Sequence, residues 1–239
     1  MDNKTYAFRK GEVILVDKPL NWTSFDVVNK LRWRLSKKYG IKRFKVGHAG
    51  TLDPLATGLL ILCTGKSTKI SQELTSEDKT YTGTFLLGKT TPSYDLETAF
   101  DKEFSIDHIC EEAIEKAAIS FTGEQKQTPP VFSAKKVNGK RAYESARKGV
   151  AVDLKENDIY IHSFIITAIR FPEVDFEIKC SKGTYIRSIA DDFGKALDAG
   201  ATLIALRRTQ SGSFLLENAK TVEEWGEIID TCEMIDELN

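Results

Sequence analysis

Residues 47–58 read Gly-His-Ala-Gly-Thr-Leu-Asp-Pro-Leu-Ala-Thr-Gly, and the apolar run 59–62 follows at once. Pro54 lacks a backbone N–H and pushes Asp53 toward extended geometry. The glycines of this stretch permit backbone shapes and close approaches that a side chain would block. The stretch therefore predicts a stiff loop that holds one carboxylate in a defined place, anchored by an apolar strand. A loop of this kind suggests a functional site; the alternative is an ordinary turn whose aspartate bonds its own backbone.

The composition is that of a globular protein with one large domain or two small ones. The chain has 239 residues, of which 41% are hydrophobic and 29% are charged. No apolar run reaches transmembrane length and the start has no signal-peptide core, so we expect a cytoplasmic protein without a membrane partner. Four cysteines stand far apart and form no Cys-x-x-Cys pair. Neither a metal site nor a disulfide is therefore expected.

The charge is distributed unevenly, although the net charge is only −1. Eight basic residues and no acidic one lie between Lys30 and His48, whereas eight acidic residues and one lysine lie between Glu217 and the end. Without that last segment the chain has 33 basic and 27 acidic residues, a net charge of +6. A local basic patch attracts phosphates even when a distant segment cancels it in the sum. The alternative for the basic run is a solvated helix face.

The chain mixes strand-like and helix-like segments without a regular βαβ rhythm. Strands are expected at 13–17, 58–63, 79–88, 159–171, 174–180 and 203–214, with a hairpin around Asn138-Gly139. Helices are expected at 24–39, from 65 or 67 onward, and at 106–120, 143–148, 184–197 and 221–229, with a polar loop at 90–107. Several strands adjoin through short turns. The sequence therefore predicts an α+β fold with a mixed, mostly antiparallel central sheet flanked by helices.

The first predicted helix has clear boundaries and an apolar face. Thr23 or Ser24 is a suitable N-terminal cap, and Gly40 stands where a helix commonly ends. Helical spacing places four residues on the core face: Phe25, Val28, Leu31 and Leu35. Trp33 lies off that stripe among arginines, where we expect partial burial, with base stacking as the alternative.

Several catalytic patterns are absent, including a Walker loop, a Gly-x-Gly-x-x-Gly motif and a Gly-x-Ser-x-Gly elbow. What remains is Asp53, tyrosines beside basic residues, and a glycine-centred segment at 180–187. Arg187 is expected in the first turn of a helix, where its guanidinium can fork onto a carboxylate and keep Asp53 ionised. The alternative for Arg187 is a surface pairing with Asp191 on its own helix.

The run 47–60 resembles the signature loop of the TruB-type tRNA pseudouridine synthases. Four further stretches resemble the same family in the same order: Asp17-Lys18-Pro19 with the following Thr-Ser, Lys79-Thr80-Tyr81, residues 130–149, and 181–187 followed by Leu206-Arg207-Arg208. The resemblance spans residues 11–215 and implies the pseudouridine synthase fold. It also implies cofactor-free isomerisation of uridine to pseudouridine in the T loop of tRNA, at tRNA position 55.

The resemblance implies a role for each matching residue. Asp53 falls on the catalytic carboxylate, Tyr185 on the second active-site tyrosine, and Arg187 on the arginine that pairs with the aspartate. The substrate-binding positions fall on His48, Tyr81, Leu206, Lys79 and Lys18. Basic residues expected at the RNA backbone are Lys42, Arg43, Lys45, Lys135, Lys136, Lys140 and Arg141. Without the resemblance, Tyr81 and Tyr185 would be packing residues, His48 a loop histidine bonded to backbone, and Leu206 simply core.

The resemblance also sets expectations for organisation and partners. Residues 1–215 are expected to form the catalytic domain, and 216–239 a short acidic helical tail with too few residues for the PUA domain that many family members carry. We expect a monomer that binds the T-loop stem-loop of tRNA without metal or cofactor. One departure is Leu20-Asn21-Trp22, where the family usually has a glycine two places after the proline.

Two other functions compete with the isomerase. A module that binds or folds tRNA without catalysis would use the same basic residues, but it needs no carboxylate held in this way. A carboxylate-based glycosidase needs a second Asp or Glu near the first, and no motif supplies one.

Overall fold

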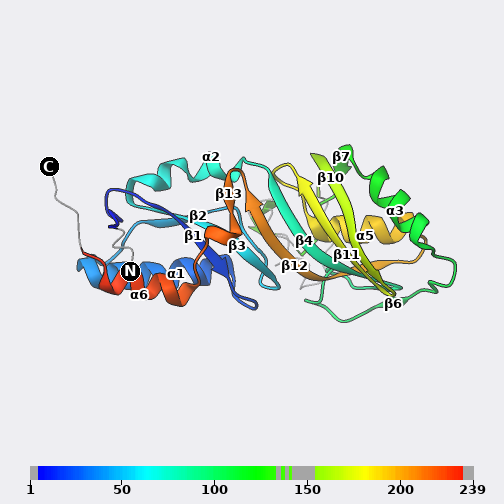
Figure 1. Cartoon of the computed structure of the whole chain (residues 1–239), viewed down its shortest axis with the longest axis horizontal. Helices are drawn as coiled ribbons and strands as arrows, with labels where there is room; N and C mark the ends of the chain where they lie inside the picture. The colour runs from blue at the N-terminus through cyan, green and yellow to red at the C-terminus, as the bar shows by residue number, and fades with distance from the viewer. Residues whose placement is uncertain (1–4, 133–135, 138–139, 142–153, 234–239) are drawn as a thin grey trace. The chain divides into compact units, whose positions relative to one another are not determined.

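The computed structural model describes residues 5–132, 136–137, 140–141 and 154–233. The chain divides into two compact units: unit 1 comprises Met1–Lys79 and Arg207–Asn239, and unit 2 comprises Thr80–Leu206. The chain leaves unit 1 at the first residue of strand β4 (Lys79–Leu87) and returns to it within strand β12 (Ala201–Ser211) (Figure 1). Unit 1 is therefore built from both ends of the chain, and unit 2 from its middle.

Unit 1 has strand β3 (Ala56–Thr64) at its centre. Strand β1 (Val13–Lys18) pairs antiparallel along the length of β3, and β2 (Val46–Ala49) pairs antiparallel with its second half. The far end of β12 lies on the other side of β3 and pairs with the short strand β13 (Phe214–Leu215). All of β3 except Thr57 is buried, as its apolar run predicts. The loop with Asp53 therefore joins two strands of this sheet.

Helix α1 (Ser24–Tyr39) has the predicted boundaries. Thr23 forms a reciprocal capping box with Asp26, and Gly40 ends the helix in the left-handed conformation at φ +64°. The prediction that Phe25 belongs to the core is wrong, because Phe25 is 59% exposed and Ser24 takes the buried position. Trp33 is also more exposed than predicted, at 58%. The buried stripe is made by Val27, Val28, Leu31 and Leu35 together with Ser24.

The chain after β12 folds back onto the start of unit 1. Gly212 turns the chain at φ +56°, so the predicted strand 203–214 is wrong at this point and becomes two strands. A 3-10 turn, η2 (Leu216–Asn218), leads to helix α6 (Val222–Thr231), which lies beside α1 (Figure 1). Trp225 is 4% exposed, and its Nε1 donates to the Leu15 carbonyl at 2.7 Å. The helix predicted within an acidic tail is thus part of the unit 1 core.

The segment after β3 is a 3-10 helix, η1 (Gly65–Ile70), that continues as helix α2 (Ser71–Thr75). The sequence predicted a single helix from 65 or 67.

Unit 2 is a sheet of the first half of β12, then β4, β11 (Glu173–Cys180), β10 (Asn157–Arg170) and β7 (Gly123–Gln127). Strand β10 pairs antiparallel with β11 and with β7. Helices α3 (Glu111–Ser120) and α5 (Ile186–Ala196) contact each other. Four phenyl rings fill the core, with centroids 4.2–6.2 Å apart: Phe85, Phe164, Phe176 and Phe193. A Cβ at Gly83 would lie 2.4 Å from the Ala205 carbonyl oxygen, so this strand contact requires glycine.

The start of α3 and two short strand pairs can be compared with the predictions for unit 2. The prediction that α3 begins at residue 106 with Asp107 as its cap is wrong, because the Ser105 hydroxyl bonds Asp107 and a turn joins Ile109 to Ile106. Strands β5 (Lys89–Thr90) and β6 (Lys102–Glu103) pair within the predicted polar loop. Strands β8 (Lys136–Val137) and β9 (Lys140–Arg141) pair as the predicted hairpin requires. The hairpin turn and the helix predicted at 143–148 lie outside the described residues.

The predicted α+β class, with a mixed sheet flanked by helices, is confirmed. In the described part of the chain, no helix has both the length and the apolar character needed to cross a membrane.

Candidate active site

Asp53 lies half-buried in the loop between β2 and β3. Both backbone groups of its neighbour Leu52 are bonded to Ser24, whose hydroxyl accepts from Leu52 N at 2.8 Å and donates to Leu52 O at 3.0 Å. Ser24 is the first residue of α1 and is 2% exposed. On the other side of Asp53, the Pro54 carbonyl accepts from Asn21 N at 2.9 Å. The backbone on both sides of the carboxylate is therefore tied to the start of α1, and the loop is as rigid as the sequence predicts.

Lys18 supports the same loop from within. Its side chain is fully buried, and Nζ donates to the carbonyls of Pro19 at 2.9 Å, Trp22 at 2.6 Å and Pro54 at 3.4 Å. Burial lowers the pKa of Lys18 from 10.5 to about 8, an effect that attraction to Asp53 opposes and repulsion from Arg208 reinforces. Lys18 is thus a buried cation that interacts with the Asp53 carboxylate.

Arg208 clamps the two strands that carry the loop. It is 1% exposed; its Nε donates to the Leu59 carbonyl at 2.7 Å, and a terminal nitrogen donates to the Gly50 carbonyl at 3.1 Å. The backbones of Gly58 and Arg208 lie close together here. A Cβ added at Gly58 would lie 2.4 Å from the Arg208 carbonyl oxygen. Gly58 also has φ +97°, which L side chains rarely adopt. This glycine of the signature stretch is required by both space and conformation.

His48 lies on β2, five residues before Asp53. Burial, with a smaller contribution from the Arg208 charge, lowers the pKa of His48, so the imidazole is neutral at neutral pH. Its Nδ1 is buried and bonds to none of the described residues. At Nδ1, therefore, the alternative of a histidine bonded to backbone is not found in the described part of the chain.

Tyr81 and Tyr185 belong to unit 2. Tyr81 is on β4 and is 9% exposed. Tyr185 is half-buried at the N-terminus of α5, and the buried Gln127 side chain brackets its backbone. Gln127 Oε1 accepts from Tyr185 N at 2.8 Å, and Gln127 Nε2 donates to Tyr185 O at 3.0 Å. The Gln127 side chain thus holds the backbone of Tyr185 in place.

Arg187 is buried in unit 2, at 4% exposure. Its Nε lies 3.7 Å from a carboxylate oxygen of Asp95, and one terminal nitrogen donates to the Phe132 carbonyl at 2.9 Å. The alternative of a surface arginine is wrong, because Arg187 is buried and pairs with Asp95, while Asp191 pairs with Lys195 at 2.6 Å. Arg187 is therefore an ordered buried cation, and its predicted pairing with Asp53 stays a prediction.

Two further predicted substrate residues lie where the chain passes between the units. Lys79 is 6% exposed, and its Nζ donates to the carbonyls of Thr75, at 2.8 Å, and Glu77. Leu206 is half-buried on β12. The amine of Lys79, like that of Lys18, is engaged by backbone carbonyls.

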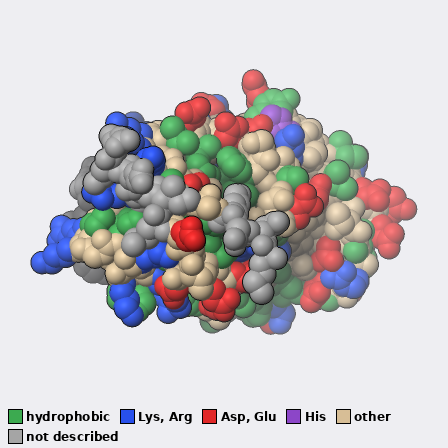
Figure 2. All heavy atoms as spheres, turned by 60° about the vertical axis from the view of Figure 1, so that its left-hand side comes forward, with side chains coloured by type: hydrophobic (Ala, Val, Ile, Leu, Met, Phe, Trp, Pro, Cys, Tyr) green, Lys and Arg blue, Asp and Glu red, His purple; other side chains and the backbone are tan. Residues whose placement is uncertain are grey.

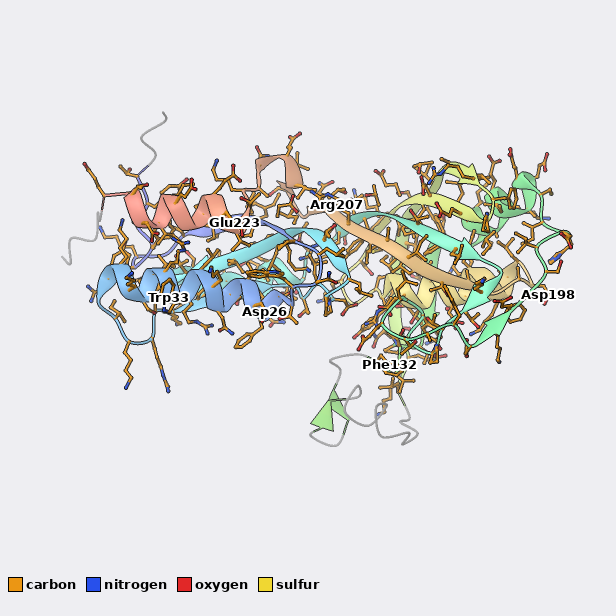
Figure 3. The ribbon with its side chains drawn as sticks, turned by 90° about the horizontal axis from the view of Figure 1, so that it is seen from below. Asp26, Trp33, Phe132, Asp198, Arg207 and Glu223 are labelled. Atoms are coloured by element: carbon orange, nitrogen blue, oxygen red, sulfur yellow. The ribbon has the colours of Figure 1, made fainter. Side chains whose placement is uncertain are left out.

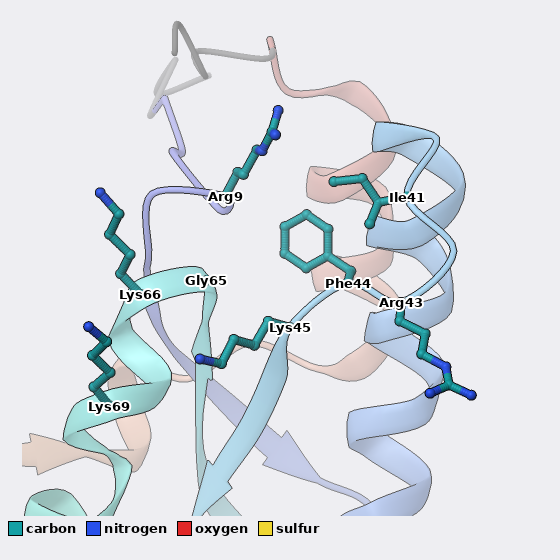
Figure 4. A pocket seen from close by; sticks show the side chains of 8 residues that line it. All are labelled: Arg9, Ile41, Arg43, Phe44, Lys45, Gly65, Lys66 and Lys69. Carbon is teal, nitrogen blue, oxygen red and sulfur yellow. The ribbon is translucent and has the colours of Figure 1, made fainter. Parts of the chain in front are cut away.

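Two of the three predicted RNA-backbone residues of unit 1, Arg43 and Lys45, line a cavity. Lys42, Arg43 and Lys45 are all exposed. The cavity, of about 310 Å³, is lined by Arg9, Ile41, Arg43, Phe44, Lys45, Gly65, Lys66 and Lys69. Figure 4 shows the Phe44 ring between Arg9 and Lys45, with Lys66 and Lys69 together on one side. This surface combines an apolar wall with five cations and suits a phosphate-bearing molecule.

The equivalent residues of unit 2 are described only in part. Lys136, Lys140 and Arg141 lie on β8 and β9, of which the structure describes the backbone, and Lys135 lies outside the described residues. Their predicted RNA contacts stay predictions.

Four residues that position the site had no assigned role at the sequence level: Ser24, Asp95, Gln127 and Arg208. Arg208 and Ser24 both stood within stretches that resemble the family, and Ser24 was also a candidate helix cap. Asp95 lay in a segment that reads as a polar loop, and Gln127 had no signal beyond its position before two prolines. Among the described residues, no group of three or more His, Cys, Asp and Glu side chains could hold a metal ion.

Two family models match the chain. Residues 36–186 match the TruB family pseudouridylate synthase N-terminal domain, and residues 187–237 match the tRNA pseudouridylate synthase B C-terminal domain. A tRNA pseudouridine synthase B from Flavobacterium johnsoniae is 54% identical over 89% of this chain and 93% of its own length. One from Phocaeicola vulgatus is 49% identical over 97% and 99%.

Solved structures show the same fold. A Cbf5-Nop10-Gar1 complex contains a chain similar to this one, with a TM-score of 0.69 and 28% identity, covering 94% of this chain and 55% of that chain. An archaeal box H/ACA sRNP Nop10-Cbf5 complex gives a TM-score of 0.67 at 25% identity, covering 93% and 55%. This chain thus spans about half of those proteins. The fold, the family models and the relatives together define a pseudouridine synthase, an RNA-modifying isomerase. More narrowly, the chain belongs to the TruB family of pseudouridylate synthases.

Proposed function

We propose that this protein isomerises uridine to pseudouridine in the T loop of tRNA, at tRNA position 55, with Asp53 as the catalytic carboxylate on a flipped-out uridine. The choice of tRNA is supported by the relatives named tRNA pseudouridine synthase B, which match this chain over nearly their whole length. The observation that carries the catalytic role is the Asp53 loop. Its backbone is fixed by Ser24, Lys18 and Arg208, and Asp53 as a residue is half-buried.

The reaction needs no external reactant. The C1′–N1 bond breaks, the uracil turns, and a C1′–C5 bond forms; C5 then loses its proton and N1 gains one. An ionised Asp53 is able to attack C1′, attack the base, or take a sugar proton, and each route needs the carboxylate charged. Lys18 favours that charge because it is a buried cation that interacts with Asp53.

The unit 2 residues are proposed to receive and process the base. Tyr81 offers a flat ring on which a flipped-out uracil stacks, and Leu206 supplies an apolar wall. Tyr185 removes the C5 proton after the new bond has formed, and Arg187 pairs with the catalytic carboxylate. Asp53 belongs to the other unit, so the proposal requires both sets of residues to act on the same uridine.

The basic residues are proposed to hold the RNA backbone. Lys42, Arg43 and Lys45 are exposed, and the last two line the cation-rich cavity of unit 1. His48 supplies a neutral imidazole whose buried Nδ1 bonds to none of the described residues. The backbone contacts position the RNA without reading its sequence, and binding weakens as salt is raised. Lys18 and Lys79 are proposed to shape the site from beneath, since their amines bond backbone carbonyls.

The test uses unmodified tRNA whose uridines carry tritium at C5. The wild-type protein is expected to release label to water from one uridine, and a transcript with cytidine at position 55 is expected to release none. Asp53→Asn should abolish release while tRNA binding and thermal unfolding stay as in the wild type. The matched control is Asp158→Asn, since that carboxylate is exposed and bonds only an exposed lysine in the described part of the chain. Release of label by Asp53→Asn at the wild-type rate would contradict the catalytic role.

The same experiment separates the rival function. If the protein only binds or folds tRNA, the wild type would bind the transcript but would release no label from it.

A further inference from the structure

The exposed face of α1 carries two large aromatic side chains that the proposed mechanism does not use. Phe25 is 59% exposed and Trp33 is 58% exposed. Each ring has a cation above it: Arg32 Cζ lies 5.8 Å from the Phe25 centroid, and Lys37 Nζ lies 5.5 Å from that of Trp33. We call Phe25, Arg32, Trp33 and Lys37 the α1 face. More than half of each aromatic residue stays accessible with its cation in place.

A groove continues the α1 face at the start of the helix. It has a volume of about 510 Å³ and is lined by Asn21, Trp22, Asp26, Asn29 and Lys30. Asp26 and Trp33 follow one another along α1 (Figure 3). The groove adds amide groups and a further aromatic residue to the face. Aromatic rings, amides and cations together are the side chains that bind unpaired nucleotides.

The charge of this surface is strongly positive. Asp26 is its only acidic residue, and its carboxylate caps the helix through the backbone N–H and hydroxyl of Thr23. These hydrogen bonds from Thr23 lower the pKa of Asp26, so the group is a satisfied cap. Asp26 therefore stays ionised, but the three cations Lys30, Arg32 and Lys37 outnumber this single carboxylate, and the surface keeps a net positive charge. Figure 2 shows Lys and Arg side chains in blue beside exposed hydrophobic side chains in green on the face that it presents.

The α1 face begins beside the Asp53 loop. Ser24, which bonds both backbone groups of Leu52, immediately precedes Phe25. Asn21 lines the groove, and its N–H donates to the carbonyl of Pro54. A strand of RNA whose nucleotide reaches Asp53 thus passes the end of α1 at which the aromatic surface starts.

We propose that the α1 face and its groove bind unpaired nucleotides of the substrate RNA, with bases stacked on Phe25 and Trp33 and phosphates on Arg32 and Lys37. This inference rests on the proposed function for the identity of the RNA. The two aromatic residues are eight positions apart, or about 12 Å along a helix axis. That exceeds the rise of about 3.4 Å per nucleotide in a stacked strand, so the rings take bases that are not direct neighbours in a stack. Charge complementarity favours RNA over a second copy of this basic surface.

The test compares Phe25→Ala, Trp33→Ala and the double variant with a matched control. The control is Phe100→Ala in unit 2, because Phe100 is 44% exposed and has Lys89 Nζ 5.3 Å from its centroid. Dissociation constants are measured for unmodified tRNA and for the T-loop stem-loop at one fixed salt concentration. Each single variant should weaken binding of at least one of these RNAs by roughly 5- to 10-fold, the low end of base–aromatic stacking. Phe100→Ala should leave binding unchanged, and Trp33→Phe should retain most of the affinity.

Three readouts exclude a merely structural effect. In tritium release the loss should fall on KM rather than kcat. Lys37→Ala should reduce the salt dependence of binding by about one ionic contact. Binding of tRNA should quench tryptophan fluorescence in the wild type and much less in Trp33→Phe.

The outcomes are separable from those of the proposed function. If the double variant binds both RNAs as the wild type does, the inference fails, whether or not the wild type releases tritium. A change in sedimentation of the double variant, with RNA binding intact, would identify the surface as a self-association site and also overturn it. If the wild type releases no label but the variants lose RNA affinity, the α1 face stands and the catalytic proposal fails.

Discussion

Replacing Lys18 by methionine should change how the stability of the protein depends on pH. Lys18 is fully buried, and its pKa is lowered from 10.5 to about 8, chiefly by burial. A shift of this size corresponds to about 3 kcal/mol of unfavourable free energy for the charged form in the folded state. Methionine fills a similar volume without a charge and removes this titration.

The sign follows from proton binding. Between pH 8 and 10.5 the unfolded chain keeps the Lys18 proton and the folded protein releases it, so the free energy of unfolding rises with pH through this window. The difference in unfolding free energy, wild type minus Lys18→Met, should therefore increase by about 2 kcal/mol between about pH 7 and 9.5. In Lys18→Met the three carbonyls also lose their hydrogen bonds to Nζ. This loss offsets the stability difference between the two proteins by the same amount at every pH.

The assay is urea unfolding at a series of pH values, followed by tryptophan fluorescence and circular dichroism. Lys116→Met, which removes an exposed lysine from α3, controls for loss of a lysine side chain as such. A difference that stays flat or falls as pH rises would refute the view that Lys18 is a buried cation held at a cost beneath the Asp53 loop.

Two other substitutions test the supports of the loop. Ser24→Ala removes the partner of both backbone groups of Leu52 and should cost about 1–3 kcal/mol of stability, measured by urea unfolding, with a larger fall in kcat than in tRNA affinity. Gly58→Ala places a Cβ 2.4 Å from the Arg208 carbonyl oxygen at φ +97° and should lower the thermal unfolding temperature sharply. Gly47→Ala, where a Cβ meets nothing within 4 Å, should leave that temperature nearly unchanged, and equal effects of the two would contradict the packing argument.

Local signals placed most of the longer elements, whereas the short strands β2 and β7 were not predicted. The capping residues of α1 and the glycine that ends it are adjacent in sequence to the helix, so its limits could be predicted to within about one residue, with the cap left open between Thr23 and Ser24. The start of α3 was missed because Asp107, an acceptable cap by type, is engaged by Ser105 instead. The strand predicted at 203–214 was broken by Gly212, whose positive φ no periodicity reveals.

The position of the functional loop was also predictable, but its supports were not. The Asp-Pro pair and its glycines mark the loop within twelve residues of sequence. The anchors come from Ser24 and Arg208, and the second of these is 149 positions from its partner Leu59. Phe25 illustrates a different limit. Residue 24 lies three, four and seven positions before Val27, Val28 and Leu31, so helical spacing places it on the buried stripe, whereas hydrophobicity favoured Phe25. The bonds between Ser24 and Leu52 satisfy the polar side chain in that buried position.

The discontinuity of unit 1 has a consequence for synthesis on the ribosome. The first 79 residues emerge early, but the guanidinium that clamps their loop and the helix that covers Leu15 arrive only with the last part of the chain, from Arg207 onward. At translation rates of about 5–20 residues per second, the early segment waits for several seconds while the continuous middle is made. A nascent chain therefore has no clamped Asp53 loop to present to RNA until the segment from Arg207 onward has been made, and products truncated before Arg207 would lack the clamp as well.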